Sequence, residues 1–204
     1  MSDTTQDATV PRLGKPFSPN KPRREEVPVD LIVIHESCTR TRSACEAVLR
    51  RKGLGVHLIV DEYGQVWIYN DPSAEAVGHA GPLNTRSIGV ELISPYYPDD
   101  ATGKIWASRP RIKARWAHKG SYVLPLPEQL EALYNAILTL CGQHPIPCTV
   151  VGKVTGKGGI LAHIDSPHDA HADGRFPARY IQQRLWGLSP EAAFRMTVQA
   201  LTTP

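Results

Sequence analysis

The sequence lacks a long apolar segment, a paired-cysteine motif and a strong excess of either charge. No stretch approaches the roughly 20 consecutive apolar residues that a membrane-spanning helix needs, so we expect no membrane span. Residues 1–10 are polar and lack the basic-then-apolar order of a secretion signal. We therefore expect the chain to be synthesised in the cytoplasm without a signal peptide.

The four cysteines, Cys38, Cys45, Cys141 and Cys148, form no CxxC pair, which argues against a zinc site built from thiolates. Free thiols are the expected state in the absence of a secretion signal, although a Cys38–Cys45 bridge stays sterically possible. The net charge of +3 is too small to indicate nucleic-acid binding. It is compatible with a partner of scattered negative charge, or simply with a solvated surface.

Apolar runs that switch between strand and helix periods predict an α/β fold, with a central mixed β-sheet flanked by helices in a single domain. The expected strands are 29–34, 56–60, 65–69, 87–93, 149–151 and 159–162, of which the second and third form a hairpin. One expected helix is capped by Thr39 or Thr41 and runs to about residue 52. The others are 127–141, 178–186 and 190–201.

Two further segments depart from this regular pattern. Residues 1–27 show no apolar period and are expected to form a flexible tail before a domain of residues 28–204. Residues 94–125 are long for a connection and carry prolines and a basic run. We expect this insertion to form a lid or rim near the active site, with a plain surface loop as the alternative.

Histidine and aspartate stand where strands are expected to end. His35 directly follows a buried strand, His163 follows the apolar run 159–162, and Asp173 lies in the loop after it. Strand ends and adjoining loops commonly display functional groups from a rigid base. Imidazole and carboxylate bind zinc, and a catalytic zinc keeps three protein ligands and a water. The three residues therefore predict a zinc site, although any single His could be an ordinary polar side chain.

Five short motifs occur in order between residues 29 and 186. They are 32–35 (IVIH), 56–61 (VHLIVD) with Gly64, 78–81 (GHAG), Asn84 with 87–92 (SIGVEL), and 162–163 (AH) with 173–177 (DGRFP). Each is weak alone. In this order they resemble the type-2 N-acetylmuramoyl-L-alanine amidases, which share their fold with the peptidoglycan recognition proteins.

The resemblance implies Zn²⁺ held by His35, His163 and Asp173. It also implies that Glu91 acts as the general base, as the corresponding residue does in the cytosolic recycling branch of the family. The alternative for Glu91 is a salt-bridged carboxylate at a strand end.

Other residues in the motifs carry further expectations. His79 and Asn84 are expected to contact the substrate, although His79 could instead anchor its loop. Many active members of the family have Lys two positions before the third ligand, where this chain has His171. A protonated imidazole could stabilise a developing oxyanion, so we expect His171 to be catalytic or, alternatively, to replace Asp173 as the ligand. Phage-type members place a Tyr before the hairpin His, and Val56 in that place gives Glu91 more weight.

The implied reaction is zinc-dependent hydrolysis of the amide bond between N-acetylmuramic acid and L-alanine, with peptidoglycan or a muropeptide as partner. We expect a monomer that binds no nucleic acid and that reaches the cell wall, if it acts there, by release or non-classical export. A non-catalytic peptidoglycan-binding module is the alternative function, and a zinc hydrolase of another amide is a third. Phage lysin, secreted effector and cytosolic recycling enzyme all stay open.

Overall fold

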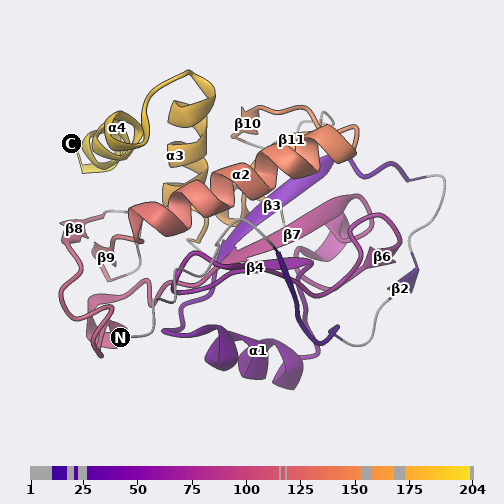
Figure 1. The fold of residues 1–204 in the computed structure, drawn as a ribbon, viewed down its shortest axis with the longest axis horizontal. Helices are drawn as coiled ribbons and strands as arrows, with labels where there is room; N and C mark the ends of the chain where they lie inside the picture. Colours follow the sequence, from indigo (N-terminus) through magenta and orange to yellow (C-terminus); the bar gives the residue numbers. More distant parts are fainter. Residues whose placement is uncertain are drawn as a thin grey trace, which may run out of the picture.

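The computed structural model describes residues 11–17, 21–22, 27–114, 116–117, 119–152, 158–167 and 173–202. Its centre is a mixed seven-stranded sheet with the strand order β1-β5-β4-β7-β3-β11-β10 (Figure 1). The strands are β1 (Arg12–Leu13), β3 (Leu31–Glu36), β4 (Leu58–Val60), β5 (Val66–Ile68), β7 (Ser87–Leu92), β10 (Val150–Val151) and β11 (Gly159–Ala162). The expected fold class, a mixed sheet flanked by helices in one domain, is confirmed.

The remaining elements are two small sheets and the helices. β2 (Lys21–Pro22) pairs with β6 (Glu75–Ala76), and β8 (Arg111–Lys113) pairs with β9 (Ser121–Val123). The α-helices are α1 (Arg42–Arg51), α2 (Pro127–Gln143), α3 (Arg175–Leu185) and α4 (Pro190–Thr202). Short 3₁₀ turns occur at Gly81–Leu83, Pro98–Asp100 and His163–Asp165.

β3 lies inside the sheet, between β7 and β11, because its first four residues, 31–34, are apolar on both faces. All of its residues are buried, and it pairs in parallel with both β7 and β11. Helices and loops cover central parallel strands on both sides, and a continuous β-branched run fits that position. The three strands run in one direction, so their carboxyl ends meet at one edge of the sheet. His35, Glu91 and His163 stand at or directly after these ends.

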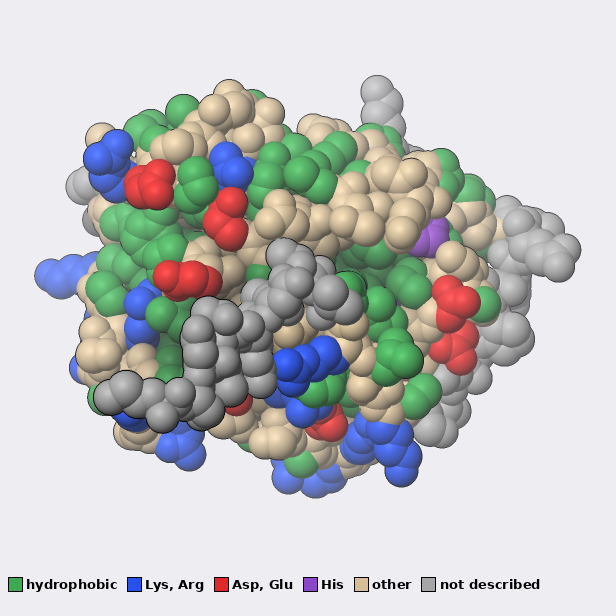
Figure 2. Space-filling view, viewed as in Figure 1, with side chains coloured by type: hydrophobic (Ala, Val, Ile, Leu, Met, Phe, Trp, Pro, Cys, Tyr) green, Lys and Arg blue, Asp and Glu red, His purple; other side chains and the backbone are tan. Residues whose placement is uncertain are grey.

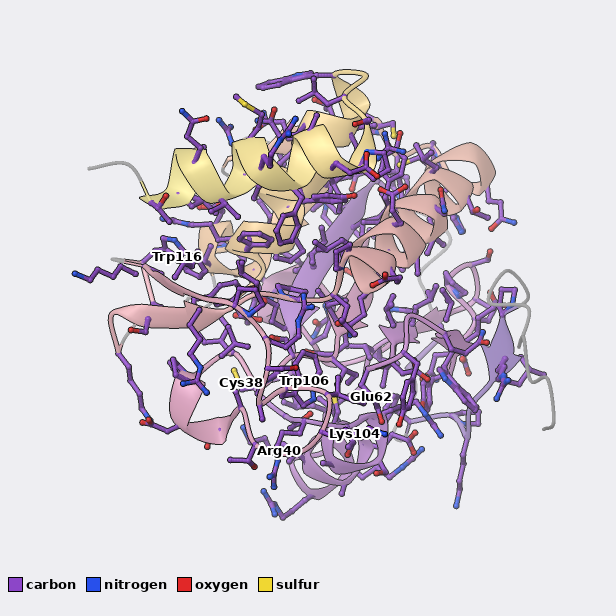
Figure 3. All side chains as sticks on the ribbon, turned by 60° about the vertical axis from the view of Figure 1, so that its left-hand side comes forward. Cys38, Arg40, Glu62, Lys104, Trp106 and Trp116 are labelled. Atoms are coloured by element: carbon purple, nitrogen blue, oxygen red, sulfur yellow. The ribbon has the colours of Figure 1, made fainter. Side chains whose placement is uncertain are left out.

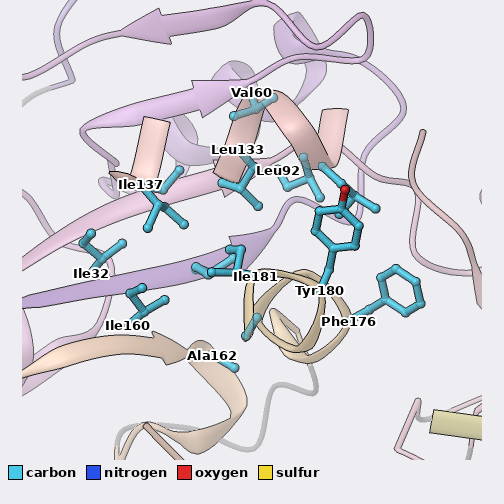
Figure 4. Packing of buried hydrophobic residues seen from close by; sticks show 14 of the residues in the cluster. Ile32, Val60, Leu92, Leu133, Ile137, Ile160, Ala162, Phe176, Tyr180 and Ile181 are labelled. Carbon is cyan, nitrogen blue, oxygen red and sulfur yellow. The ribbon is translucent and has the colours of Figure 1, made fainter. Parts of the chain in front are cut away.

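Helices cover both faces of the sheet. α2, α3 and α4 lie on one face and α1 lies on the other (Figure 1). On the first face, Ile32 and Ile160 from the sheet belong to the same buried cluster as Leu133 and Ile137 of α2 and Ile181 of α3 (Figure 4). This cluster fixes α3, whose first turn follows directly after Asp173, against the sheet.

α1 begins where the sequence offers a hydroxyl cap. Thr41 Oγ1 accepts a hydrogen bond from the backbone N–H of Ala44 at 3.3 Å, so Thr41, of the two expected candidates, caps the helix. Its buried residue is Cys45, while its last turn carries Arg50 and Arg51. Figure 2 shows Lys and Arg side chains along the lower edge of the molecule, the edge where α1 lies in Figure 1. Within the described part of the chain, no helix has the length and apolarity to cross a membrane.

Several expected boundaries differ from the structure by a few residues, and two of them lie next to the site. The strand expected to end before His35 continues through Glu36, because Glu36 pairs with Leu92 of β7. The helix expected from residue 178 begins at Arg175. Pro177 lies in its first turn, where the backbone N–H has no partner inside the helix and proline is tolerated.

Two segments expected to be irregular contain paired strands. The insertion 94–125 includes the β8–β9 hairpin, and Tyr122 of β9 is fully buried. In the segment expected as a tail, β1 pairs with β5 and Phe17 is buried against Tyr69, with ring centroids 4.8 Å apart. Part of that segment is therefore packed on the domain.

Candidate metal centre

His35, His163 and Asp173 meet at the carboxyl edge of the sheet. Each offers one ligand atom, and these atoms all lie within 4.8 Å of one another. The parallel register explains the two imidazoles, because Ala162 of β11 lies opposite Ile34 of β3 and the next residue on each strand is His. The two rings lie 4.4 Å apart between centroids. The structure thus brings together the three residues that the sequence predicted as ligands.

Asp173 connects both imidazoles. Its Oδ1 lies 2.9 Å from His163 Nδ1, and its Oδ2 lies 3.6 Å from His35 Nδ1. Its Oδ2 also accepts a hydrogen bond from the Glu36 backbone N–H at 3.2 Å. Burial alone would raise the pKa of Asp173, but the hydrogen bonds with His163 and His35 outweigh burial and hold this pKa below its usual range. The carboxylate is therefore ionised, which is the form that binds a cation.

A hydrogen-bonded chain behind His35 fixes its tautomer. His35 Nε2 lies 3.1 Å from His79 Nδ1, and His79 Nε2 lies 3.1 Å from Ser87 Oγ. Ser87 donates its single hydroxyl hydrogen to the Leu83 carbonyl at 2.7 Å, so it accepts from His79. His79 Nδ1 then accepts from His35 Nε2. In neutral His35 this assignment leaves the lone pair on Nδ1, the nitrogen that faces Asp173, whereas in protonated His35 the same nitrogen donates to the carboxylate.

The loop that carries His79 is fixed at close range. Asn84 Oδ1 accepts hydrogen bonds from the backbone N–H groups of His79 and Ala80, at 3.0 and 2.7 Å. A Cβ atom at Gly89 would lie 2.8 Å from the His79 ring, so only glycine at that position of β7 lets the imidazole pack there. The ring nitrogens of His79 face His35 and Ser87, and Asn84 supports its backbone.

Two buried carboxyl groups lie next to the three candidate ligands. Glu91 is opposite His35 in the register of β3 and β7. Burial first, and then the charges of Asp173 and Glu36, raise its pKa well above the ordinary value. Burial also raises the pKa of Glu36 to about 8, although a hydrogen bond from Tyr122 opposes the shift. A carboxyl group of raised pKa holds a proton more strongly, which suits proton transfer near neutral pH.

The centre opens into a cleft of about 250 Å³. Its wall includes His35, Glu91, His163 and Asp173 together with the apolar or aromatic side chains of Leu49, Leu54, Tyr96 and Tyr97. The tyrosines belong to the insertion 94–125, which folds back over the chain that leaves β3.

In Figure 3, Cys38, Arg40 and Trp106 lie together, and Trp106 Nε1 donates to the Arg40 carbonyl at 2.8 Å. A larger cavity, of about 820 Å³, lies between the β4–β5 hairpin and α2 and is lined by none of the three candidate ligands.

Similarity to a known protein family identifies the family of this chain. The family model described as N-acetylmuramoyl-L-alanine amidase matches residues 25–176. The chain belongs to this amidase family. The match includes His35, Glu91, His163 and Asp173. No curated protein matches the sequence.

Solved structures of amidases share the fold of this family member at low sequence identity. The amidase LysC from Clostridium intestinale has a TM-score of 0.58 and 13% identity, covering 86% of this chain and 97% of its own. Hydrolase AmiA from Staphylococcus aureus has a TM-score of 0.57 and 14% identity, covering 93% and 82%. AmiD from E. coli, in complex with anhydro-N-acetylmuramic acid-L-Ala-D-gamma-Glu-L-Lys, has a TM-score of 0.55 and 17% identity, covering 83% and 62%. Peptidoglycan recognition protein-LE, in complex with tracheal cytotoxin, has a TM-score of 0.51 and 15% identity, covering 90% and 95%.

The donor set of this amidase-family chain fits zinc. Two imidazoles and a carboxylate are among the ligand sets of catalytic zinc, with bonds of about 2.0–2.2 Å and a fourth position left open. Ligand atoms that converge within 4.8 Å need only small movements to reach a common ion. All three residues also line the cleft, through which a substrate would reach them.

Sequence reasoning missed some supporting residues of the amidase-family site and named one that falls outside the described residues. Glu36 and Tyr122 were not singled out, because one was expected after the strand and the other in an irregular loop. Ser87 was noted as a strand residue and as part of the 87–92 motif, but no hydrogen bond to His79 was expected of it. His171, expected to be catalytic, lies outside the described residues.

Proposed function

We propose that this chain hydrolyses the amide bond between N-acetylmuramic acid and L-alanine in peptidoglycan or muropeptides, in a zinc-dependent reaction. The observation that carries the proposal is the convergence of His35, His163 and Asp173 at a cleft that also contains Glu91. Family membership and the fold shared with amidases support the substrate class. AmiD, one of the structures with this fold, is itself complexed with a muropeptide substrate.

Zinc bound by His35, His163 and Asp173 would supply a Lewis acid that polarises the scissile carbonyl and lowers the pKa of a water molecule. The chain's own residues prepare that position. Asp173 supplies negative charge. The hydrogen bond to His79 leaves the lone pair of His35 on Nδ1, which faces the same position. Tyr96, Tyr97 and Leu54 border the cleft and limit the access of bulk water.

Glu91 is the best candidate for the general base. It would take a proton from the attacking water and later deliver it to the leaving amine of L-alanine. Among the described residues, no hydrogen bond holds its carboxylate, which leaves both oxygens available. Glu36 is less suited, because its two oxygens accept hydrogen bonds from Tyr122 and Gly174.

The remaining expected site residues take different places in the proposal. His171 precedes Asp173 by two positions and is proposed to stabilise the tetrahedral oxyanion, with metal ligation as its alternative role. For His79, the hydrogen bonds to His35 and Ser87 favour a supporting role over a substrate contact. Asn84 acts with it, through the backbone of the same loop.

The test uses the purified full chain. Metal analysis should find one zinc per chain, and incubation with peptidoglycan or a soluble muropeptide should release stem peptides with a free L-alanine amine. Chelation should stop this release, and added zinc should restore it. Undiminished cleavage after complete removal of metal would contradict the proposal. Retention on peptidoglycan without any product would instead support the binding-module alternative.

A further inference from the structure

Glu36 is a buried acidic residue that the proposed reaction does not use. It follows His35 at the end of β3 and is 3% exposed. Its Oε1 accepts a hydrogen bond from the Tyr122 hydroxyl, and its Oε2 accepts one from the Gly174 backbone N–H at 3.0 Å. Its own backbone N–H donates to Asp173 Oδ2 at 3.2 Å. Glu36 therefore holds two consecutive residues of the loop that supplies the third ligand.

The loop that contains Asp173 and Gly174 lies in close contact with β3. Gly174 has φ +83°, and a Cβ atom there would lie 2.2 Å from the Ile34 carbonyl oxygen. The Ile164 N–H also donates to the Asp173 carbonyl at 3.1 Å. With so little space, a small change in the Gly174 backbone would move the Asp173 carboxylate relative to both imidazoles. The Glu36 carboxylate is the side chain that binds the Gly174 N–H.

Tyr122 in turn holds Glu36. It is fully buried in β9, and its ring lies 5.1 Å from Tyr96, 4.7 Å from Trp116 and 5.4 Å from Phe176 of α3, measured between centroids. Its rotamer is therefore fixed by packing, and its hydroxyl fixes the Glu36 carboxylate. This connection places one residue of the insertion 94–125 two hydrogen bonds away from the Asp173–Gly174 loop.

We propose that Glu36 is a positioning residue of the metal centre, which holds Asp173 and Gly174 in the ligating geometry and is itself held by Tyr122. The inference rests on the proposed function for the identity of the metal. Groups that orient metal ligands commonly change metal affinity by about 10- to 100-fold when they are removed. The insertion 94–125 is then a structural part of the metal centre as well as a wall of the cleft.

The experiment measures the zinc dissociation constant of the full chain by competition with a chelating indicator. Glu36→Ala removes both acceptors and should weaken zinc binding by about 10- to 100-fold. Glu36→Gln should stay within about threefold of wild type, because the amide oxygen accepts from Gly174 and the amide nitrogen donates to the tyrosine oxygen. Tyr122→Phe should weaken binding by several-fold. Tyr63→Phe, which removes a hydroxyl from an exposed tyrosine, is the matched control and should change nothing.

Circular dichroism of the metal-free variants separates misfolding from weakened binding. A folded Glu36→Ala variant with wild-type zinc affinity would overturn the proposal. If that variant does not fold, Tyr122→Phe decides, and an unchanged dissociation constant would again overturn it. The affinity series does not require turnover, so it tests the positioning role even if wild type binds zinc without cleaving peptidoglycan.

Discussion

His35 and His79 face each other through ring nitrogens 3.1 Å apart, although 44 positions separate them in the sequence. The hydrogen bond at Nε2 orients the ring of His35, the first proposed ligand, as expected for a histidine that binds metal through its other nitrogen, Nδ1. Ser87 completes the chain by accepting from His79. The position of His79 therefore affects the metal centre directly, and this relationship gives the first two predictions.

Replacing His79 with Ala should weaken zinc binding by about 10- to 100-fold, because His35 loses the acceptor that fixes its tautomer. His79→Asn should retain part of the affinity, since its Oδ1 can accept a hydrogen bond at nearly the position of Nδ1. Indicator competition measures both variants. Equal zinc affinity in wild type and His79→Ala would show that the contact does not orient the ligand.

Gly89→Ala should reduce both zinc affinity and stability. The new Cβ would lie 2.8 Å from the His79 ring, so the imidazole must shift. Overpacking of this kind costs about 1–3 kcal/mol of unfolding free energy. Thermal unfolding and indicator competition measure the two effects. Gly142→Ala is the control, because its Cβ would meet nothing within 4 Å. A Gly89→Ala variant that matches wild type in both measurements would show that the close approach is unimportant.

Glu91→Gln should leave zinc bound and reduce turnover by about 10²- to 10⁴-fold, the usual contribution of general acid–base catalysis. The metal-free variant should be at least as stable as wild type, because the substitution removes a buried, unpaired carboxyl group. Product release from a soluble muropeptide and metal analysis measure these outcomes. Near-normal turnover with one zinc per chain would remove Glu91 from the role of base.

The stability of the metal-free chain should fall as the pH rises from about 4.5 to about 8, in part because of Glu36. Its pKa is raised from 4.5 to about 8 in the folded state. Between these values the folded chain holds a proton that the unfolded chain has lost, so the unfolding free energy decreases as the pH increases. Glu36→Gln removes this contribution. The unfolding free energy of the variant should therefore rise relative to that of wild type across that range, by on the order of 3 kcal/mol. Denaturant unfolding at a series of pH values is the measurement, and parallel curves for the two proteins would contradict the expectation.

The sequence predicted those parts of the site that depend on one strand at a time. The β-branched run before His35 and the apolar run before His163 indicated two buried strands, and the parallel register then places the two imidazoles side by side. Contacts between segments that are distant in the sequence produce no comparable pattern of apolar residues. Nothing in the local sequence around His79 indicates that its ring packs on Gly89 and bonds to His35, because these contacts depend on how the loop 78–84 lies over β7.

Glu36 and Tyr122 show a second reason why part of the site could not be predicted from the sequence. An acidic residue after an apolar run is usually solvated, so the strand was expected to stop before it. In the structure, Leu92 pairs with Glu36 and the insertion buries it. β8 and β9 are short, and the basic residues around them resemble a solvated loop. The hairpin is stabilised by Tyr122 packing against Phe176 of α3, a contact between distant segments that local patterns do not reveal.

The hydrogen bond from Glu36 to Asp173 joins residues 137 positions apart, near the two ends of the described domain. An ion bound between His35, His163 and Asp173 would cross-link the first central strand to the segment that leads into α3, much as a disulfide would. Loading the site should therefore slow amide hydrogen exchange in α3 as well as in the ligand loops, and chelation should release the C-terminal helices before the middle of the sheet. In this chain the catalytic ion would also hold the two C-terminal helices, α3 and α4, against the rest of the fold.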